Sequence, residues 1–350
     1  MLKKSVVLAL ITAFAMTSEL AVASKGRIGI AFPTQNESAW YSAGPSLVND
    51  LKKRGYDTVL YYGGDNDVPI QQRQISRMLN EDKVNAMIVA PIDANILLDQ
   101  LKPVKKAGVP VISFDRLIMY SDAVKYYVAF DNSLVGKMQA QSIIDALKLD
   151  ERSSSDPAYL EIVGGAPKDK SVEGAYNGFL SMILPYIDDG KLVVPSDQFF
   201  LNMVAVKNGS SDNALKRMDD LISKQGYGPK GKKLDAVYCA SDTVADGVVR
   251  GLKKAGYTRE NMPFLCGRDA TESQLKGILA GERGSTIYRD PNKLNDSAAM
   301  IIDALMSGKQ PEINDTSSYN NGLDNMNSVV CEPVLVDRSN IKTLFPDLHL

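Results

Sequence analysis

An acidic and a basic residue follow directly after a stretch of the chain that is typical of a buried strand. Residues 109–114 are mostly apolar and come after an Ala-Gly turn, and Asp115 and Arg116 stand at their end. In open α/β sheets a ligand lies beyond the carboxyl ends of the strands, so this strand would deliver a carboxylate and a guanidinium to that edge. Such a pair suits a ligand with many hydroxyl groups. The alternative is an exposed ion pair, which contributes about 0–1 kcal/mol.

Other predicted strands end in the same way. Polar residues follow the apolar stretches 86–90, 125–130, 236–240 and 264–267, and in chain order they are Asp93, Asp131, Asn132, Ser241, Asp242, Arg268 and Asp269. Parallel strands share one carboxyl edge, so we expect these side chains to gather there. The repetition favours a binding site over a set of unrelated surface ion pairs.

The elements that must position these residues alternate regularly between strand and helix, which predicts an α/β fold with doubly wound parallel sheets. The first part carries predicted strands at 27–32, 58–62, 86–90, 109–114 and 125–130, with helices at 40–54, 68–80 and 96–107. After a helix at 134–147 the pattern restarts, with strands at 159–163, 192–199, 236–240, 264–267, 284–288 and 329–336. A chain of 350 residues exceeds the size at which one core usually splits, about 250–300 residues, so two domains are expected.

Composition and the amino terminus narrow the function classes. The formal charge is −2 and no sustained basic patch occurs, so nucleic acid is not an expected partner. Residues 1–23 have a lysine pair, an apolar core and an Ala-Val-Ala cleavage site, which predicts a secretory signal peptide. No cysteine stands at the cleavage site, so a lipid anchor is not expected. The mature protein is expected outside the cytoplasm.

Cysteine and glycine patterns give no sign of a cofactor. Cys239, Cys266 and Cys331 stand among apolar residues and are interpreted as buried small hydrophobes, with a Cys239–Cys266 disulfide as the alternative. The only histidine is His349, and no cysteine spacing matches a zinc site, so no metal is expected. The glycine pairs at 63–64 and 164–165 do not extend to a phosphate-binding motif.

A set of short motifs in a fixed order resembles the periplasmic sugar-binding proteins of ABC importers, and most of all their xylose-binding and ChvE-like multiple-sugar-binding group. The motifs stand at 29–33, 91–93, 114–116, 128–132, 241–242 and 267–270. The resemblance implies a type I periplasmic-binding-protein fold, in which two Rossmann-like lobes are joined by a three-stranded hinge. It places the crossings near 130–131, 269–270 and 327–331, with residues 24–131 and 270–327 in the N-terminal lobe and residues 132–269 and 328–350 in the C-terminal lobe.

The resemblance also implies a set of sugar-binding residues drawn from both lobes. They are Glu37, Trp40, Asp115, Arg116, Asp169, Lys170 (with Lys168 as its alternative), Asn208, Asp242, Arg268, Asp269 and Arg289. Trp40 would stack on an apolar sugar face, while the polar groups would bind ring oxygen and hydroxyls. Two positions depart from the ChvE-like pattern, since Arg268 replaces a glutamine and Asn208-Gly209 stand where a tryptophan is expected. An acidic sugar therefore becomes a candidate beside neutral aldoses.

The expected function is capture of a monosaccharide in a cleft between the lobes, followed by hinge closure and delivery to an ABC importer permease in the membrane. Two alternatives remain open. One is a glycosidase in which Asp115 and Asp242 act as paired carboxylates, although Arg116 beside Asp115 would keep that carboxyl ionised. The other is a co-receptor of the same fold that serves a chemoreceptor or a sensor kinase. An enzyme is not the expected outcome.

Overall fold

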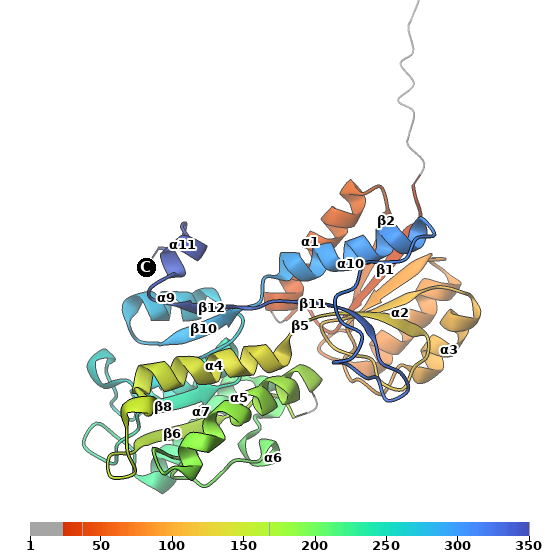
Figure 1. Ribbon diagram of the computed structural model, residues 1–350. Coiled ribbons are helices and arrows are strands. Elements are labelled where there is room, and N and C mark those ends of the chain that lie inside the picture. Colours follow the sequence, from red (N-terminus) through yellow and green to blue (C-terminus); the bar gives the residue numbers. More distant parts are fainter. Residues whose placement is uncertain (1–23, 37, 168, 350) are drawn as a thin grey trace, which may run out of the picture.

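The first lobe is built on one parallel sheet. The computed structural model describes residues 24–36, 38–167 and 169–349 (Figure 1). The sheet order is β11-β5-β4-β3-β1-β2, and its strands are β1 (Arg27–Phe32), β2 (Asp57–Tyr62), β3 (Ala86–Val89), β4 (Val111–Phe114), β5 (Val124–Phe130) and β11 (Asn327–Cys331). Every pairing in it is parallel, as predicted for a doubly wound fold.

Helices cover both faces of this sheet, because alternate residues of each strand point to opposite sides. One face packs Ile28 and Ile30 against α1 (Ser38–Lys53) and α10 (Pro291–Met306). The other face packs Met87 against α2 (Val68–Asn80) and α3 (Leu98–Lys106).

The second lobe repeats this plan with a smaller sheet (Figure 1). Its strand order is β7-β6-β8-β9, and the strands are β6 (Ala158–Val163), β7 (Leu192–Val193), β8 (Ala236–Cys239) and β9 (Phe264–Leu265). One face carries α4 (Asn132–Leu147) and α5 (Lys170–Asp188), and the other carries α7 (Ser211–Gln225) and α8 (Asp242–Lys254). The strand predicted over 192–199 ends at Val193 because Pro195 has no N–H for the ladder and Asp197 turns the chain with a φ of 53°.

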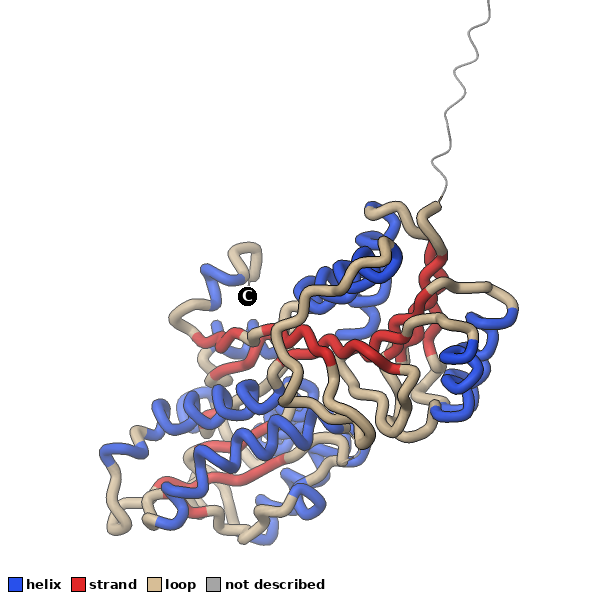
Figure 2. Tube along the Cα trace, turned by 45° about the vertical axis from the view of Figure 1, so that its right-hand side comes forward, coloured by secondary structure: helices blue, strands red, loops and turns tan. Residues whose placement is uncertain are grey.

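The second and third crossings between the lobes differ from the positions that the resemblance implies. Helix α9 (Glu272–Ala280) packs on α8, and β10 (Ser285–Tyr288) packs on α4, so the chain returns to the first lobe near residue 290 and not at residue 270. Two backbone bonds hold β10 on the edge of the second sheet: the Gly267 N–H donates to Ser285, and the Ile287 N–H donates to the Gly267 carbonyl. The crossings therefore run from β5 to α4, from β10 to α10 and from β11 to β12 (Val334–Asp337). Figure 2 shows strands that run between the two lobes.

The last predicted strand, 329–336, is in fact two strands in different lobes. Strand β11 pairs with β5 in the first lobe, while β12 pairs antiparallel with β10 in the second. Pro333 lies between them, where it interrupts the ladder. Consequently residues 327–331 belong with the first lobe, and the third crossing lies at residues 332–333.

All three cysteines are free and buried, as the sequence predicts. Cys239 belongs to the core beneath α7 and α8, whereas Cys266 belongs to the core beneath α4 and α5. The two side chains therefore lie on opposite faces of the sheet, which excludes the alternative disulfide. Among the described residues no cluster of metal-ligating side chains and no helix long and apolar enough to cross a membrane is found.

Helices α4 and α5 approach each other at glycines. A Cβ built on Gly136 would lie 1.7 Å from the backbone oxygen of Ala175, and one on Gly178 would lie 2.2 Å from the oxygen of Ser133. Since α4 is the helix that follows the first crossing, this contact fixes how the second lobe is attached.

We expect Gly136→Ala to lower the free energy of unfolding by about 3 kcal/mol or more, because the added methyl meets backbone atoms that cannot rotate away. Urea unfolding measures this change. Gly228→Ala is the matched control, since its Cβ would have only an ordinary contact at 3.9 Å. Equal stability of the two variants would contradict the described helix packing.

Candidate functional site

The residues after β4 are held in a turn that aims two charged side chains beyond the sheet. Asp115 has a φ of 56°, its N–H donates to Val128 at 2.8 Å, and its carbonyl accepts from the Tyr127 hydroxyl at 2.8 Å. The Ser113 hydroxyl donates to the carbonyl of Arg116 at 2.7 Å. The backbone at this strand end is thus fixed, and both charged residues lie where the strand pattern predicts them.

Arg116 lies between the two lobes. Its guanidinium carbon lies 5.3 Å from the ring centroid of Trp40, a buried side chain that also packs on Phe32. On the other side its Nε lies 3.8 Å from Oδ2 of Asp169, the N-cap residue of α5 in the second lobe. The other oxygen, Oδ1, accepts from the N–H and hydroxyl of Ser171 at 2.8 and 2.7 Å.

Arg289, on the second crossing, joins carboxylates from both lobes. Its Nη1 donates to Oδ1 of Asp115 at 3.2 Å, while Nε and Nη2 donate to Oδ1 of Asp269 at 3.0 and 2.6 Å. Burial acts to raise the pKa of Asp269, but Arg289 and Arg268 outweigh it, so this pKa lies below its usual value. The pKa of Arg289 is raised, because the acids more than offset its burial. Asp269 and Arg289 are therefore charged together.

Arg268 is the least satisfied charge of the group. Its side chain is buried, with 5% of the residue exposed, and its Nε lies 3.6 Å from Oδ1 of Asp269. Among the described residues Nε and Nη1 of Arg268 find no hydrogen-bond acceptor. Burial opposes ionisation of Asp169 as well, but Arg116 and Arg268 bring its pKa below the usual value. We call Asp115, Arg116, Asp169, Arg268, Asp269 and Arg289 the interlobe cluster.

Asp242 lies behind this cluster and not within it. It is fully buried, and its oxygens accept from the Thr271 N–H at 2.7 Å and from the Thr286 hydroxyl at 2.8 Å. Burial, with the nearby negative charge of Asp269, raises the pKa of Asp242 well above its ordinary value. The bonds tie the turn after Asp269 to β10, so Asp242 supports the cluster from inside the second lobe.

The remaining predicted residues are not gathered with the cluster. Asn208 is exposed, in a short turn after α6 (Leu201–Val204), with a φ of 58°. Glu37 and Lys168 lie outside the described residues, as does the side chain of Lys170. Sequence reasoning missed Tyr127 and the two threonines that position the acids, because neutral hydroxyl residues in strands and turns carry no distinctive signal.

This geometry, with two parallel-sheet lobes, chain crossings and charges that meet between them, agrees with comparisons to known proteins. Residues 28–310 match the family described as periplasmic binding protein domain. The chain belongs to the periplasmic binding protein family. The predicted resemblance and fold class are thereby confirmed.

Relatives of this periplasmic binding protein cover nearly its whole length. The multiple sugar-binding periplasmic receptor ChvE of Rhizobium radiobacter is 39% identical over 321 residues, which cover 91% of this chain and 88% of the relative. The D-xylose-binding periplasmic protein of Escherichia coli is 28% identical, and the match covers 97% of this chain and 95% of that protein. A solved structure of an ABC transporter solute-binding protein from Clostridium phytofermentans, with bound β-D-glucose, has a TM-score of 0.86 and is 35% identical. The match covers 93% of this chain and 98% of that chain.

The raised pKa of Asp242 predicts a pH-dependent cost to stability. The folded protein keeps this proton at pH values where the unfolded chain, with a carboxyl pKa of about 3.9, has lost it, so stability falls as the pH rises toward the folded pKa. Asp242→Asn removes this pH-dependent loss of stability and keeps an oxygen that can accept from the Thr271 N–H. We expect the difference in unfolding free energy, variant minus wild type, to grow between pH 4 and pH 8 in urea titrations. A constant difference would contradict the raised pKa.

Proposed function

We propose that this periplasmic binding protein captures a monosaccharide between its lobes and delivers it to the membrane permease of an ABC importer. The observation that carries the proposal is the interlobe cluster, in which Arg116 of the first lobe approaches Asp169 of the second to 3.8 Å. Sugar hydroxyls both donate and accept, so burial requires acids and guanidinium groups on every side, since an unmatched buried polar group costs about 1–3 kcal/mol. The cluster supplies both kinds of group.

Division of these groups between lobes explains how binding is signalled. A sugar held by Asp115 and Arg116 alone has only some of its hydroxyl groups hydrogen-bonded. Closure adds partners from the second lobe, namely Asp169, Arg268 and Asp269. The ligand therefore shifts the open-closed equilibrium toward the closed form. A permease that fits the closed form distinguishes loaded protein from empty protein.

Trp40 completes the proposed site as an aromatic plate, although Arg116 lies over its ring in this arrangement. Glu37, Lys170 and Asn208 remain predicted sugar contacts. Export to the periplasm through the signal peptide at 1–23, without a lipid anchor, is part of the same proposal. A chemoreceptor or sensor kinase is a second candidate partner, since the relative ChvE is named a receptor.

The burial of Asp242 counts against the glycosidase alternative. Both carboxylates of a glycosidase must reach the scissile bond, about 5–9.5 Å apart. Asp242 is fully buried, and protein donors occupy its oxygens. The named relatives are a sugar-binding receptor and a sugar-binding protein, which agrees with a function without catalysis.

A thermal-shift screen over pentoses, hexoses and uronic acids tests the proposed function. We expect at least one sugar to raise the melting temperature, because a ligand at 100 times its Kd adds about 2.7 kcal/mol of stability. Asp115→Asn should abolish the shift, since it removes the carboxylate but tolerates the positive φ of residue 115. Asp99→Asn, at an exposed position on α3, is the control and should keep the full shift. No shift with any sugar would refute sugar capture.

Arg268 bears on whether the ligand is an acidic or a neutral sugar. Its two buried donors lack acceptors among the described residues, and the neighbouring Asp269 is already bonded to Arg289. A ligand carboxylate placed there would satisfy a charge that a single hydroxyl satisfies less well. We therefore include uronic acids in the proposed ligand class beside neutral aldoses.

Affinities for galacturonate and galactose, measured by calorimetry at several salt concentrations, test this refinement. We expect galacturonate to bind more tightly in the wild type, with an affinity that falls as salt rises. Arg268→Gln should weaken galacturonate binding about tenfold or more, the worth of a charged hydrogen bond, and change galactose binding less. Equal affinities that do not respond to salt would restrict the ligand to neutral sugars.

A further inference from the structure

Three asparagines are followed directly by glycine, at 177–178, 208–209 and 321–322. Asparagine is a chemically labile residue, and a glycine after it has no side chain to hinder its backbone nitrogen. That nitrogen can attack the side-chain carbonyl carbon of the asparagine. A new C–N bond forms, and the amide nitrogen leaves as ammonia together with the backbone proton. Water then opens the ring to aspartate or isoaspartate, which adds one negative charge.

The first pair lies inside a helix. Asn177 is exposed on α5, but each N–H of an α-helix is bonded to the carbonyl four residues earlier. Gly178 also packs against α4, where an added Cβ would lie 2.2 Å from the carbonyl oxygen of Ser133. The Gly178 nitrogen therefore cannot rotate toward the Asn177 side chain unless the contact between the two helices opens.

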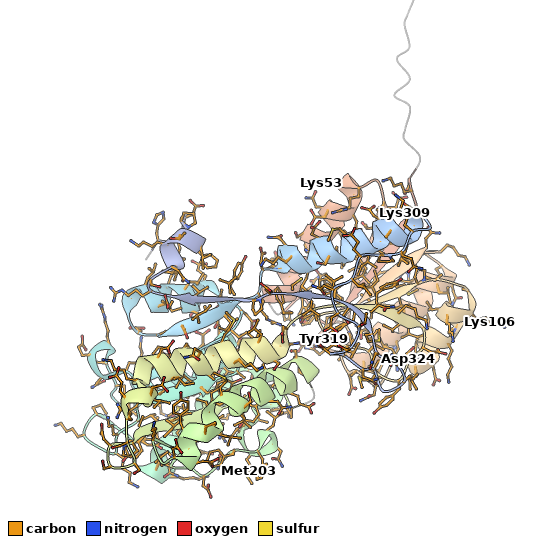
Figure 3. All side chains as sticks on the ribbon, in the orientation of Figure 1. Lys53, Lys106, Met203, Lys309, Tyr319 and Asp324 are labelled. Carbon is orange, nitrogen blue, oxygen red and sulfur yellow. The ribbon has the colours of Figure 1, made fainter. Side chains whose placement is uncertain are left out.

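The third pair is buried in the first lobe, beside Asp324 (Figure 3). The Asn321 side-chain amide donates to the carbonyl of Ser121 at 3.0 Å, and its oxygen accepts from the Asp324 N–H at 3.0 Å. The Gly322 N–H donates to the side-chain oxygen of Asn320 at 2.7 Å. Both reacting groups of this pair are thus held by hydrogen bonds.

The second pair lies in an exposed turn of the second lobe. The turn follows shortly after Met203, which Figure 3 labels at the lower margin of that lobe. Asn208 and Gly209 have φ values of 58° and 61°, as in a type I′ turn. The bond from the Ser210 N–H to the Lys207 carbonyl is long, at 3.4 Å. Among the described residues the exposed Asn208 side chain makes no hydrogen bond.

Local opening of this turn leaves its surroundings intact. Ring formation requires the Gly209 nitrogen to rotate out of the turn toward the Asn208 side chain, which breaks its bond of 2.9 Å to the Val206 carbonyl. On the α7 side, the Asn213 side chain still holds the Lys207 carbonyl at 3.0 Å. The reaction therefore needs an opening of two residues, whereas the other two pairs need a helix contact or a buried loop to open.

We propose that Asn208 is a site of spontaneous deamidation in the folded protein, selected over Asn177 and Asn321 by the freedom of its turn. The product carries an additional negative charge immediately before α7. Asn208 is also a predicted sugar contact, so the modification replaces one amide of the proposed site with a carboxylate. That consequence rests on the proposed function, whereas the modification itself does not.

Incubation of the folded protein at mildly alkaline pH, followed by tryptic digestion and mass spectrometry, tests the proposal. Alkaline pH favours the attack because it helps to remove the backbone proton. Trypsin cleaves after Lys207 and Lys216, so Asn208 begins a short peptide, and fragment ions separate it from Asn213. Relative to an unincubated sample, this peptide should deamidate about tenfold faster or more than those with Asn177 and Asn321, because its opening breaks fewer contacts.

A parallel incubation in urea separates the effect of structure from that of sequence. The Asn-Gly pair is common to all three sites, so their rates should become similar when the chain is unfolded. Ion-exchange chromatography gives a second measurement, in which an acidic species should accumulate in the folded wild type. Asn208→Gly keeps a residue that tolerates positive φ and should prevent this species, whereas Asn177→Gln, the exposed control on α5, should not.

Similar rates at the three sites in the folded protein would overturn the proposal. The same preference for Asn208 in urea would overturn it as well, because the fold would then have no part in the selection. Neither measurement uses a ligand. Calorimetry of Asn208→Asp with D-glucose addresses the sugar contact separately, with an expected loss of about two- to tenfold in affinity. Unchanged affinity would remove Asn208 from the proposed sugar site.

Discussion

The arrangement of the two lobes depends on one largely buried cation, which has 12% of its side chain exposed. Arg289 lies on the second crossing, and removal of a guanidinium from water costs several kcal/mol unless carboxylates compensate it. Asp115 from the first lobe and Asp269 from the second provide that compensation at hydrogen-bond distance. Because neither acid alone satisfies the arginine, the strand ends of both lobes are held toward the same point. The interaction gives the hinge a preferred geometry before any ligand is considered.

Arg268 is less completely paired than Arg289, and this difference separates two roles. Arg289 uses three donors on the two acids, whereas Arg268 has buried donors without acceptors among the described residues. The distance of 3.8 Å between Arg116 and Asp169 exceeds hydrogen-bond length. Arg289 therefore acts mainly in holding the lobes, while Arg268 and Asp169 have capacity to exchange weak contacts for bonds to a ligand.

Much of the fold follows from local pattern, since buried parallel strands read as short apolar runs and the acids at their ends are visible in the sequence. Asp115, Arg116 and Asp269 were predicted at the sheet edge for that reason. The second crossing lies elsewhere than the resemblance implies, because the return at residue 290 depends on the pairing of β10 with β12, nearly fifty residues later. The place of Asp242 depends likewise on Thr271 and Thr286, distant residues whose contacts no local pattern reveals.

Asp242 and Asp269 illustrate how neighbouring carboxylates acquire opposite properties in one lobe. Only neutral donors bond to Asp242, and burial together with Asp269 raises its pKa. Asp269 is half-buried, with 27% of its side chain exposed, and two guanidinium groups lower its pKa against the effect of burial. An anionic ligand that draws Arg268 or Arg289 away from Asp269 reduces this compensation, whereas sugar hydroxyls add donors to the acid. In the proposed site, attraction for a ligand carboxylate is therefore balanced against the cost of leaving Asp269 less neutralised, and we propose that this balance sets which sugars bind.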